Sequence, residues 1–364
     1  MVMEKTVIHI VSNKVWGGGE QYVYDLARRQ HADDYRVALL CRPVEAVQAR
    51  LRELDVPIHT LPLKGIADLK SAWRIAQILK QTQSPCLVHV HNFKDAFTAA
   101  YARRLSGRTD VRLVMTRHLV RSGKTSLPYR WIYRQLDCLV FVSELARSAF
   151  YSTHPPMPVD RTIIIHTGIE LPVKIIPIGI RSRYGIGDTG VVAMYHGRLA
   201  YEKGVHTLID AMTRLRDLPL WLVMVGAGDE SLHRLAVDKQ VDDRVIFAGF
   251  QHPVLPWVVE ADFGVLPSMV REACPLAPQE YMSQGIPVVA TDNGGQREYI
   301  ADGINGLLVP HGAPERLAEA MRTLATDADF RRKLGCQAKI DFDCSLTYDH
   351  LYSAIRNLYQ QLGL

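Results

Sequence analysis

The chain has 364 residues, of which 48% are hydrophobic, and a formal net charge of +5. This length suggests about two domains with sizeable cores, and no apolar run approaches the roughly 20 residues that cross a bilayer. The first apolar strand is too short for a signal-peptide core, and the six cysteines lack Cys-x-x-Cys spacing. A disulfide framework and a zinc site are therefore not indicated, and a cytoplasmic protein is expected.

The first half of the chain alternates apolar strands with helical stretches. Strands are expected at Val7–Ser12, Val37–Cys41, Ile58–Leu61, Leu87–His91, Leu113–Thr116 and Leu139–Ser143. Helices are expected at Glu20–Gln30 and Leu69–Gln81, among others. Continuous apolar strands separated by helices are typical of parallel sheets that are covered on both faces.

A glycine loop, Gly17-Gly18-Gly19-Glu20, follows the first strand. Glycines let a backbone approach a ligand closely and can present N–H groups to a phosphate, although such a run is also common as a flexible turn. Histidines 89, 91 and 118 follow or end later strands, where they can bind a ligand or shape the strand end through hydrogen bonds.

The segment from Arg103 to Arg134 is strongly basic, with nine Lys or Arg residues and one acid, Asp110. Tyr129, Trp131 and Tyr133 lie among the last of these cations. This composition suits anionic lipid headgroups or a phosphorylated glycolipid, and equally a solvated basic face with Trp131 in the core. Because no nucleic-acid motif accompanies the stretch, nucleic acid is not expected as a partner.

A stretch rich in Gly, Pro and Ile at 167–188 is interpreted as an interdomain crossing. A second series of strands follows at Val191–Tyr195, Leu220–Val225, Val245–Ala248, Phe263–Leu266, Ile286–Ala290 and Leu307–Val309. Arg198 and Lys203 come after the first of these strands and just before a helix that starts near Gly204. The free N–H groups of a helix N-terminus favour anions, so these cations either bind phosphate or form an ordinary solvated loop.

Two glutamates, Glu272 and Glu280, lie eight positions apart between the last strands of this series. One is expected in a loop and the other in a helix, both at the carboxyl ends of parallel strands, where open α/β sheets bind ligands. Carboxylates only accept hydrogen bonds when ionised, which suits the paired hydroxyls of a ribose or a hexose.

The glutamate pair, the Gly197-Arg198…Lys203-Gly204 frame and the N-terminal glycine loop together resemble the family 4 (group 1) glycosyltransferases, which are retaining enzymes of the GT-B fold. The resemblance implies two Rossmann-like parallel-sheet α/β domains that face an interdomain cleft. Residues 1–167 would bind the acceptor and 168–345 the nucleotide sugar, and the last helix, at 346–364, would cross back onto the first domain.

The resemblance also implies roles for individual residues. The catalytic set would be Arg198 and Lys203 on the departing diphosphate, Glu272 on the donor sugar, and His118 against sugar and acceptor. Glu280 would hold the ribose, and the other donor-binding residues would be Gly17, Gly18, Gly19, Gly197, Gly226, Gly228, Phe250, Leu276 and Ala277. Acceptor contacts are expected from Glu20, His91, Arg117 and Arg121. Neither a metal nor another cofactor is expected.

By this resemblance the protein would move a sugar from a nucleoside-diphosphate sugar, with UDP-sugar favoured, to a glycan or lipid-linked acceptor. Bacterial lipopolysaccharide, capsule or other polysaccharide biosynthesis is the expected setting, in the cytoplasm and at an anionic inner-membrane surface. The alternatives are a nucleotide-sugar epimerase of the same fold and a non-catalytic nucleotide-sugar-binding protein. The chain departs from the family where Glu272-Ala273-Cys274-Pro275 replaces the usual Glu-Gly-Phe-Gly, and Gln279 stands where an apolar residue is usual.

Overall fold

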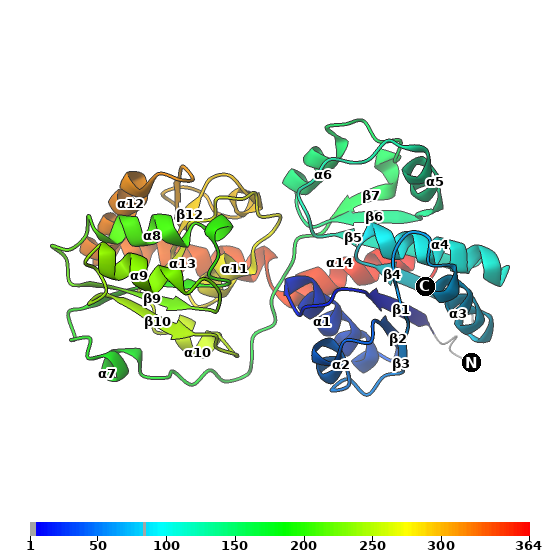
Figure 1. Ribbon diagram of the computed structural model, residues 1–364, viewed down its shortest axis with the longest axis horizontal. Coiled ribbons are helices and arrows are strands. Elements are labelled where there is room, and N and C mark those ends of the chain that lie inside the picture. Colours follow the sequence, from blue (N-terminus) through cyan, green and yellow to red (C-terminus); the bar gives the residue numbers. More distant parts are fainter. Residues whose placement is uncertain (1–4, 83–84) are drawn as a thin grey trace. The chain divides into compact units, whose positions relative to one another are not determined.

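The computed structural model describes residues 5–82 and 85–364. The chain divides into two compact units, Met1–Thr167 with Leu351–Leu364, and Gly168–His350. Each unit is built on one parallel sheet with helices packed against it (Figure 1). The fold class expected from the sequence, two Rossmann-like parallel-sheet units, is confirmed.

The N-terminal unit contains a seven-stranded sheet in the order β3-β2-β1-β4-β5-β6-β7. Its strands are β1 (Thr6–Val11), β2 (Arg36–Cys41), β3 (Ile58–Thr60), β4 (Cys86–Val90), β5 (Val111–Arg117), β6 (Cys138–Phe141) and β7 (Thr162–Ile164). Its helices are α1 (Gly18–Ala32), α2 (Glu45–Leu51), α3 (Leu69–Gln81), α4 (Phe93–Ser106), α5 (Leu127–Gln135) and α6 (Glu144–Tyr151). The short edge strand β7 is the one described strand of this unit that the sequence pattern does not predict.

The C-terminal unit contains a six-stranded sheet in the order β10-β9-β8-β11-β12-β13. Its strands are β8 (Val191–His196), β9 (Leu220–Val225), β10 (Val245–Gly249), β11 (Phe263–Leu266), β12 (Val288–Thr291) and β13 (Leu307–Val309). Its helices are α7 (Ile180–Tyr184), α8 (Val205–Met212), α9 (Ser231–Asp238), α10 (Leu255–Val258), α11 (Leu276–Ser283), α12 (Pro314–Thr326) and α13 (Ala328–Ser345). The expected crossing at 167–188 includes α7, whose Ile180 is buried in the core of this unit.

Both sheets reverse their strand order beside their first strand, between β1 and β4 in one and between β8 and β11 in the other. Ligands of open α/β sheets bind at such a switch point, outside the carboxyl ends of the strands. The loops after β1 and β4, and those after β8 and β11, are therefore placed to form a ligand site in their own unit.

Local sequence signals set the helix starts beside these strand ends. Asn92, two residues after the end of β4, caps α4 because its side chain accepts a hydrogen bond from Asp95 N. Ser143 caps α6 in the same way after β6, by accepting from Ala146 N. A cap of this kind satisfies one of the unpaired N–H groups of the first turn, typically for about 1 kcal/mol.

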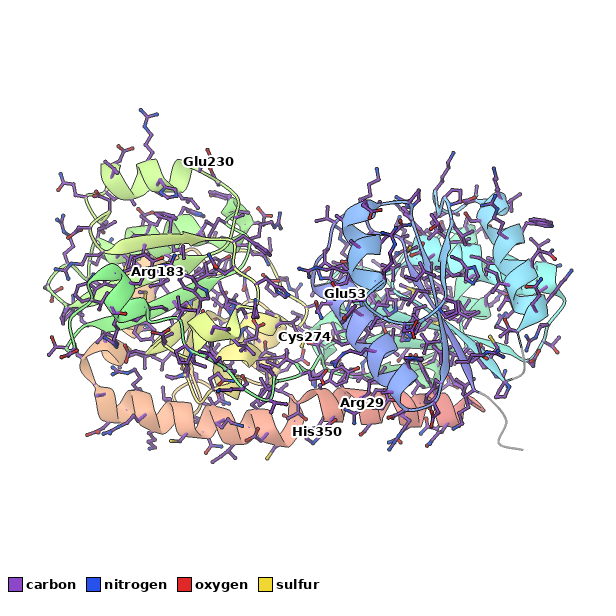
Figure 2. All side chains as sticks on the ribbon, turned by 90° about the horizontal axis from the view of Figure 1, so that it is seen from below. Arg29, Glu53, Arg183, Glu230, Cys274 and His350 are labelled. Atoms are coloured by element: carbon purple, nitrogen blue, oxygen red, sulfur yellow. The ribbon has the colours of Figure 1, made fainter. Side chains whose placement is uncertain are left out.

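The last helix, α14 (Tyr348–Gln361), lies beside the sheet of the N-terminal unit (Figure 1). Its Tyr359 is 1% exposed. The Arg29 guanidinium at the end of α1 lies 5.3 Å from the ring centroid of Tyr352 on this helix (Figure 2). Among the helices of residues 5–82 and 85–364, none combines the length and apolar character that a bilayer-spanning segment needs.

Candidate functional site

The loop after β8 carries Arg198 and Lys203, the first pair of cations expected at a phosphate. Arg198 is 65% exposed at its side chain and pairs with Glu202 at 2.8 Å. Lys203 Nζ lies 2.5 Å from Oε1 of Glu272, which follows β11, and the two side chains are 25% and 16% exposed. The structure thus brings together two of the expected catalytic residues that lie 69 positions apart in the sequence.

Close backbone packing explains why glycines occur in the loops after β8 and β9. Gly204 adopts φ +70°, and a Cβ there would lie 1.9 Å from Pro267 O. A Cβ on Gly226 would lie 1.9 Å from Gly197 O. Only glycine is compatible with such approaches, so these residues hold the loops after β8, β9 and β11 against one another. This steric role accounts for Gly204 and Gly226 whether or not a ligand touches them.

Glu272 is held by more than its ion pair with Lys203. Ser268 Oγ donates to Glu272 Oε1 at 2.9 Å, and Gly295 N donates to Glu272 O at 2.8 Å. The carboxylate therefore has a defined position and keeps its second oxygen, Oε2, for another donor. A sugar hydroxyl is a suitable partner, because an ionised carboxylate accepts several hydrogen bonds.

The departure from the family pattern after Glu272 forms an ordered substructure. Gln279 is fully buried on α11, and its Nε2 lies 3.3 Å from Cys274 Sγ. Tyr299 donates its hydroxyl hydrogen to Pro275 O at 2.8 Å. Figure 2 shows Cys274 at the start of the segment that leads into α11. Gln279 and Tyr299 thus hold the Cys-Pro loop, which gives the polar residue at 279 a structural reason.

Glu280 lies on α11 and faces a histidine that sequence reasoning missed. Its Oε2 is 3.1 Å from Nε2 of His196, the last residue of β8, and the side chains are 22% and 7% exposed. Burial raises the pKa of Glu280 to about 7 and lowers the pKa of His196 to about 4. Burial therefore favours the neutral forms of both groups. The position of His196 directly before Gly197 and Arg198 was the sequence signal.

The remaining expected donor contacts lie at other strand and helix ends of the C-terminal unit. Phe250 follows β10 and is 68% exposed. Leu276 and Ala277 open α11, which has no side-chain cap. Gly228 packs against Leu199, since a Cβ there would lie 2.0 Å from Leu199 O.

The glycine loop of the N-terminal unit leads directly into α1. Gly17 occupies the N-cap position without a side-chain cap, and Gly18 and Gly19 form the first turn. The first N–H groups of this helix therefore lack intrahelical partners and suit an anion. Glu20 is 5% exposed, and its carboxylate accepts a short hydrogen bond from Asn13. Glu20 is therefore buried in the first turn of α1 and hydrogen-bonded to the preceding loop.

The histidines after β4 and β5 lie together beneath Tyr22. The rings of His91 and His118 stack with centroids 5.7 Å apart, and the Tyr22 ring meets His118 edge-on at 4.9 Å. Burial lowers the pKa of His118 to about 4, and burial lowers the pKa of His91 well below its ordinary value. Both are neutral at physiological pH, so they can offer hydrogen bonds but no charge.

One group of three histidines has the spacing of metal ligands. Nitrogen atoms of His9, His89 and His91 lie within 4.8 Å of one another. Both ring nitrogens of His89 are already engaged, with Tyr359 OH at 2.6 Å and Thr116 Oγ1 at 2.8 Å. A zinc ion needs at least three protein ligands, and in the described part of the chain these two hydrogen bonds already occupy the nitrogens through which His89 would bind it.

Arg117 was expected on a basic surface, and the structure corrects this. It is 8% exposed, with its guanidinium 5.4 Å from the Phe93 ring centroid and 5.1 Å from that of Phe150. It donates to Arg121 O and Ser122 O and so holds the loop after β5. Its buried position follows from these rings, which cover the cation.

The rest of the basic segment is only partly a surface. Arg103 pairs with Asp137 at 2.8 Å, and Arg108 pairs with Asp110. Trp131 stacks on Tyr101 with centroids 5.0 Å apart, so the expected interfacial aromatic packs inward. The exposed cations between 121 and 134, called the 121–134 patch, are Arg121, Lys124, Arg130 and Arg134. Two exposed apolar residues accompany them, Leu119 at 56% and Leu127 at 78%.

Comparison with known proteins gives two family matches. Residues 179–341 match the model "Glycosyl transferases group 1", and residues 16–172 match "Glycosyltransferase Family 4". The chain is 38% identical to the lipopolysaccharide core biosynthesis glycosyltransferase LpsE of Rhizobium meliloti over 143 residues, or 39% of this chain and 42% of that one. The match thus spans less than half the length of this relative.

Two further likenesses cover most of the chain. It is 28% identical to the GDP-mannose-dependent alpha-(1-6)-phosphatidylinositol monomannoside mannosyltransferase of Mycolicibacterium smegmatis, over 86% of this chain and 79% of that one. Its fold matches HepE of Anabaena, solved in complex with UDP and glucose, with a TM-score of 0.84, 19% identity and coverage of 98% and 99%. The structural likeness shows the GT-B fold.

Proposed function

Since the chain belongs to the group 1 glycosyltransferases, we propose that it transfers a sugar from a nucleoside-diphosphate sugar to a glycan or lipid-linked acceptor with retention of configuration. A UDP-sugar is the favoured donor. The observation that carries the proposal is the contact between Lys203 and Glu272, which joins a phosphate-binding cation to a hydroxyl acceptor at the switch point of one sheet.

In this proposal, donors of the protein itself stabilise the negative charge of the departing diphosphate. Lys203 has three donors and uses one of them on Glu272, so it can also bind a phosphate oxygen. Arg198 is exposed and can exchange Glu202 for a bidentate contact with phosphate. The N-terminus of α8 adds unpaired N–H groups after Gly204. These donors neutralise the leaving group without a metal.

The two glutamates and the histidines are assigned to the sugar and the ribose of the donor. Glu272 accepts from donor-sugar hydroxyls through its free oxygen, and Glu280 accepts from the ribose. His118 lies against the sugar, with His91 beside it. Reaction occurs on one face of the sugar: the departing phosphate oxygen takes the proton of the acceptor hydroxyl as the new glycosidic bond forms. The site stabilises the separated charge of the oxocarbenium ion and the diphosphate, so no protein nucleophile is needed.

The acceptor side of the proposal rests on relatives and on the N-terminal unit. Named relatives act in lipopolysaccharide synthesis and on a phosphatidylinositol mannoside. The 121–134 patch combines cations with Leu119 and Leu127, which suits an anionic membrane surface. We therefore place the reaction in the cytoplasm and at the inner membrane, on a growing polysaccharide or lipid-linked glycan.

A thermal-shift screen with UDP, GDP, UDP-glucose, UDP-galactose, UDP-N-acetylglucosamine and GDP-mannose tests the donor class. A ligand that binds only the folded protein stabilises it by mass action, by about 2.7 kcal/mol at a concentration of 100 Kd. The stabilising sugar nucleotide is then tested for slow hydrolysis without acceptor. Conversion to another sugar nucleotide would indicate an epimerase, and binding without any turnover on supplied acceptors would indicate a binding protein. Failure of every nucleotide to bind would overturn the proposal.

A further inference from the structure

Four imidazoles lie on or directly after neighbouring strands of the N-terminal unit. His9 lies on β1 and pairs in register with His89 on β4. His91 follows β4, and His118 follows β5. His9 and His89 are fully buried. Stacking relates His9 to His91, with centroids 5.7 Å apart, and His91 to His118 at the same separation.

The hydroxyl of Tyr359 on α14 hydrogen-bonds to His89 and to Gln30, and the position of its proton determines which of these groups donate and which accept. It lies 2.6 Å from Nδ1 of His89, a short distance that is typical of an O–H donor rather than an N–H donor. Burial raises the pKa of Tyr359 well above its ordinary value, so the hydroxyl keeps its proton. Since this proton goes to His89, the group of Gln30 that faces Tyr359 must be the amide donor, and its Nε2 lies 3.5 Å away.

The orientation of the Gln30 amide then determines the tautomer of His9. With Nε2 toward Tyr359, the carbonyl oxygen Oε1 faces His9 Nε2 at 2.8 Å. An amide oxygen can only accept, so His9 carries its proton on Nε2 and leaves a lone pair on Nδ1. Burial lowers the pKa of His9 to about 4, so this ring is neutral and holds a single proton.

The position of the proton on His9 in turn determines the tautomers of His91 and His118. His9 Nδ1 lies 3.5 Å from His91 Nε2, and His91 Nδ1 lies 3.4 Å from His118 Nε2. A lone pair on His9 Nδ1 requires a proton on His91 Nε2, which leaves His91 Nδ1 as an acceptor for His118 Nε2–H. His118 therefore ends with a lone pair on Nδ1. No partner for this atom is found among residues 5–82 and 85–364.

We propose that Tyr359, Gln30, His9 and His91 form a relay that fixes the tautomer of His118 and presents its Nδ1 as a hydrogen-bond acceptor for a hydroxyl of the bound sugar or acceptor. This inference rests on the proposed function for the identity of the ligand. Within it, His118 touches substrate, and the other four are positioning residues. The relay makes the last helix of the chain a determinant of the site, although α14 is remote in sequence.

The tautomers can be measured without any substrate. In the full-length protein with 15N-labelled histidine, two-bond 1H–15N spectra distinguish the Nε2–H tautomer, the Nδ1–H tautomer and the imidazolium. The expected result is Nε2–H for His9, His91 and His118 at pH 7, with assignments from single His→Gln variants. A proton on Nδ1 of His118, or an imidazolium at this pH, would overturn the relay. So would displacement of these signals by one equivalent of Zn²⁺, which would identify a metal site.

Tyr359→Phe tests the origin of the relay, with Tyr352→Phe on the same helix as its matched control. Loss of the Tyr359 hydroxyl frees the Gln30 amide to turn, so His118 should populate both tautomers. Turnover should then fall about fivefold, the factor that corresponds to one net hydrogen bond, while UDP affinity stays unchanged. Tyr352→Phe should preserve the single tautomer and turnover. An unaltered His118 spectrum in Tyr359→Phe would refute the role of Tyr359, whereas absent sugar transfer in a protein with the expected tautomers would refute only the function.

Discussion

The stability of Glu280→Gln relative to wild type should increase as the pH rises from 4.5 to 7 and should stay at its highest value above pH 7. The reason is that the Glu280 carboxyl is buried against His196, and burial raises its pKa from 4.5 to about 7. Below pH 4.5 the carboxyl is protonated in both the folded and unfolded states. Between pH 4.5 and 7 only the folded state binds the proton, so the stability of the wild-type protein falls across this range and the contribution is lost once the pH has risen through 7. Glutamine is neutral throughout and carries no such dependence.

The magnitude follows from the two pKa values of the carboxyl. Between pH 5.5 and 8.5 the ionisation of Glu280 should remove about 2 kcal/mol of folding free energy from the wild-type protein. For a unit of this size, that difference corresponds to a change in Tm of about 5 °C. Histidines 9, 118 and 196, whose pKa values burial lowers to about 4, destabilise the folded state only as the pH falls below 6.5. The contributions of His9 and His118, which lie in the N-terminal unit, are common to both proteins and cancel in the comparison.

Urea unfolding of both proteins at pH 5.5 and 8.5 is the assay, with the exposed Glu230→Gln as control (Figure 2). The stability difference between Glu280→Gln and wild type should change by about 2 kcal/mol between the two pH values in favour of the variant at pH 8.5. The control should show no such change. A difference that is equal at both pH values would refute the burial of an ionisable Glu280 as the origin of the effect.

Three further predictions concern the reaction, and one concerns the membrane. Lys203→Ala should lower turnover by at least about 100-fold, because leaving-group charge is greatest in the transition state, and near-normal rates in a donor-hydrolysis assay would sink the phosphate assignment. In calorimetric titrations with UDP, Glu280→Ala should weaken binding and Glu272→Ala should leave it nearly intact while impairing transfer; equal losses would contradict the division of roles. Excess chelator should leave most activity, so abolition that Mg²⁺ or Mn²⁺ restores would count against a metal-free leaving group. The protein should sediment with anionic but not zwitterionic vesicles at low salt, and reversal of the charges of the 121–134 patch should abolish this without affecting donor hydrolysis; indifference of the wild-type protein to anionic vesicles would leave the patch an ordinary solvated face.

Local sequence patterns were sufficient for the architecture and for the order of the motifs. Continuous apolar strands separated by amphipathic helices can bury both faces only in parallel sheets, and this predicts two such sheets. The glycine, cation and glutamate motifs kept the order and spacing that indicated the family. These features depend on residues within a few positions of one another, so they can be read along the chain.

The side-chain contacts within the candidate site depended on the tertiary structure. Lys203 meets Glu272 and His196 meets Glu280 because the sheet places the ends of β8 and β11 side by side, which no local pattern encodes. Burial also decided roles that charge alone suggested wrongly: Arg117 lies between two aromatic rings rather than at the surface. A residue's neighbours and its exposure are set by strand order and packing, and these arise only when distant segments meet.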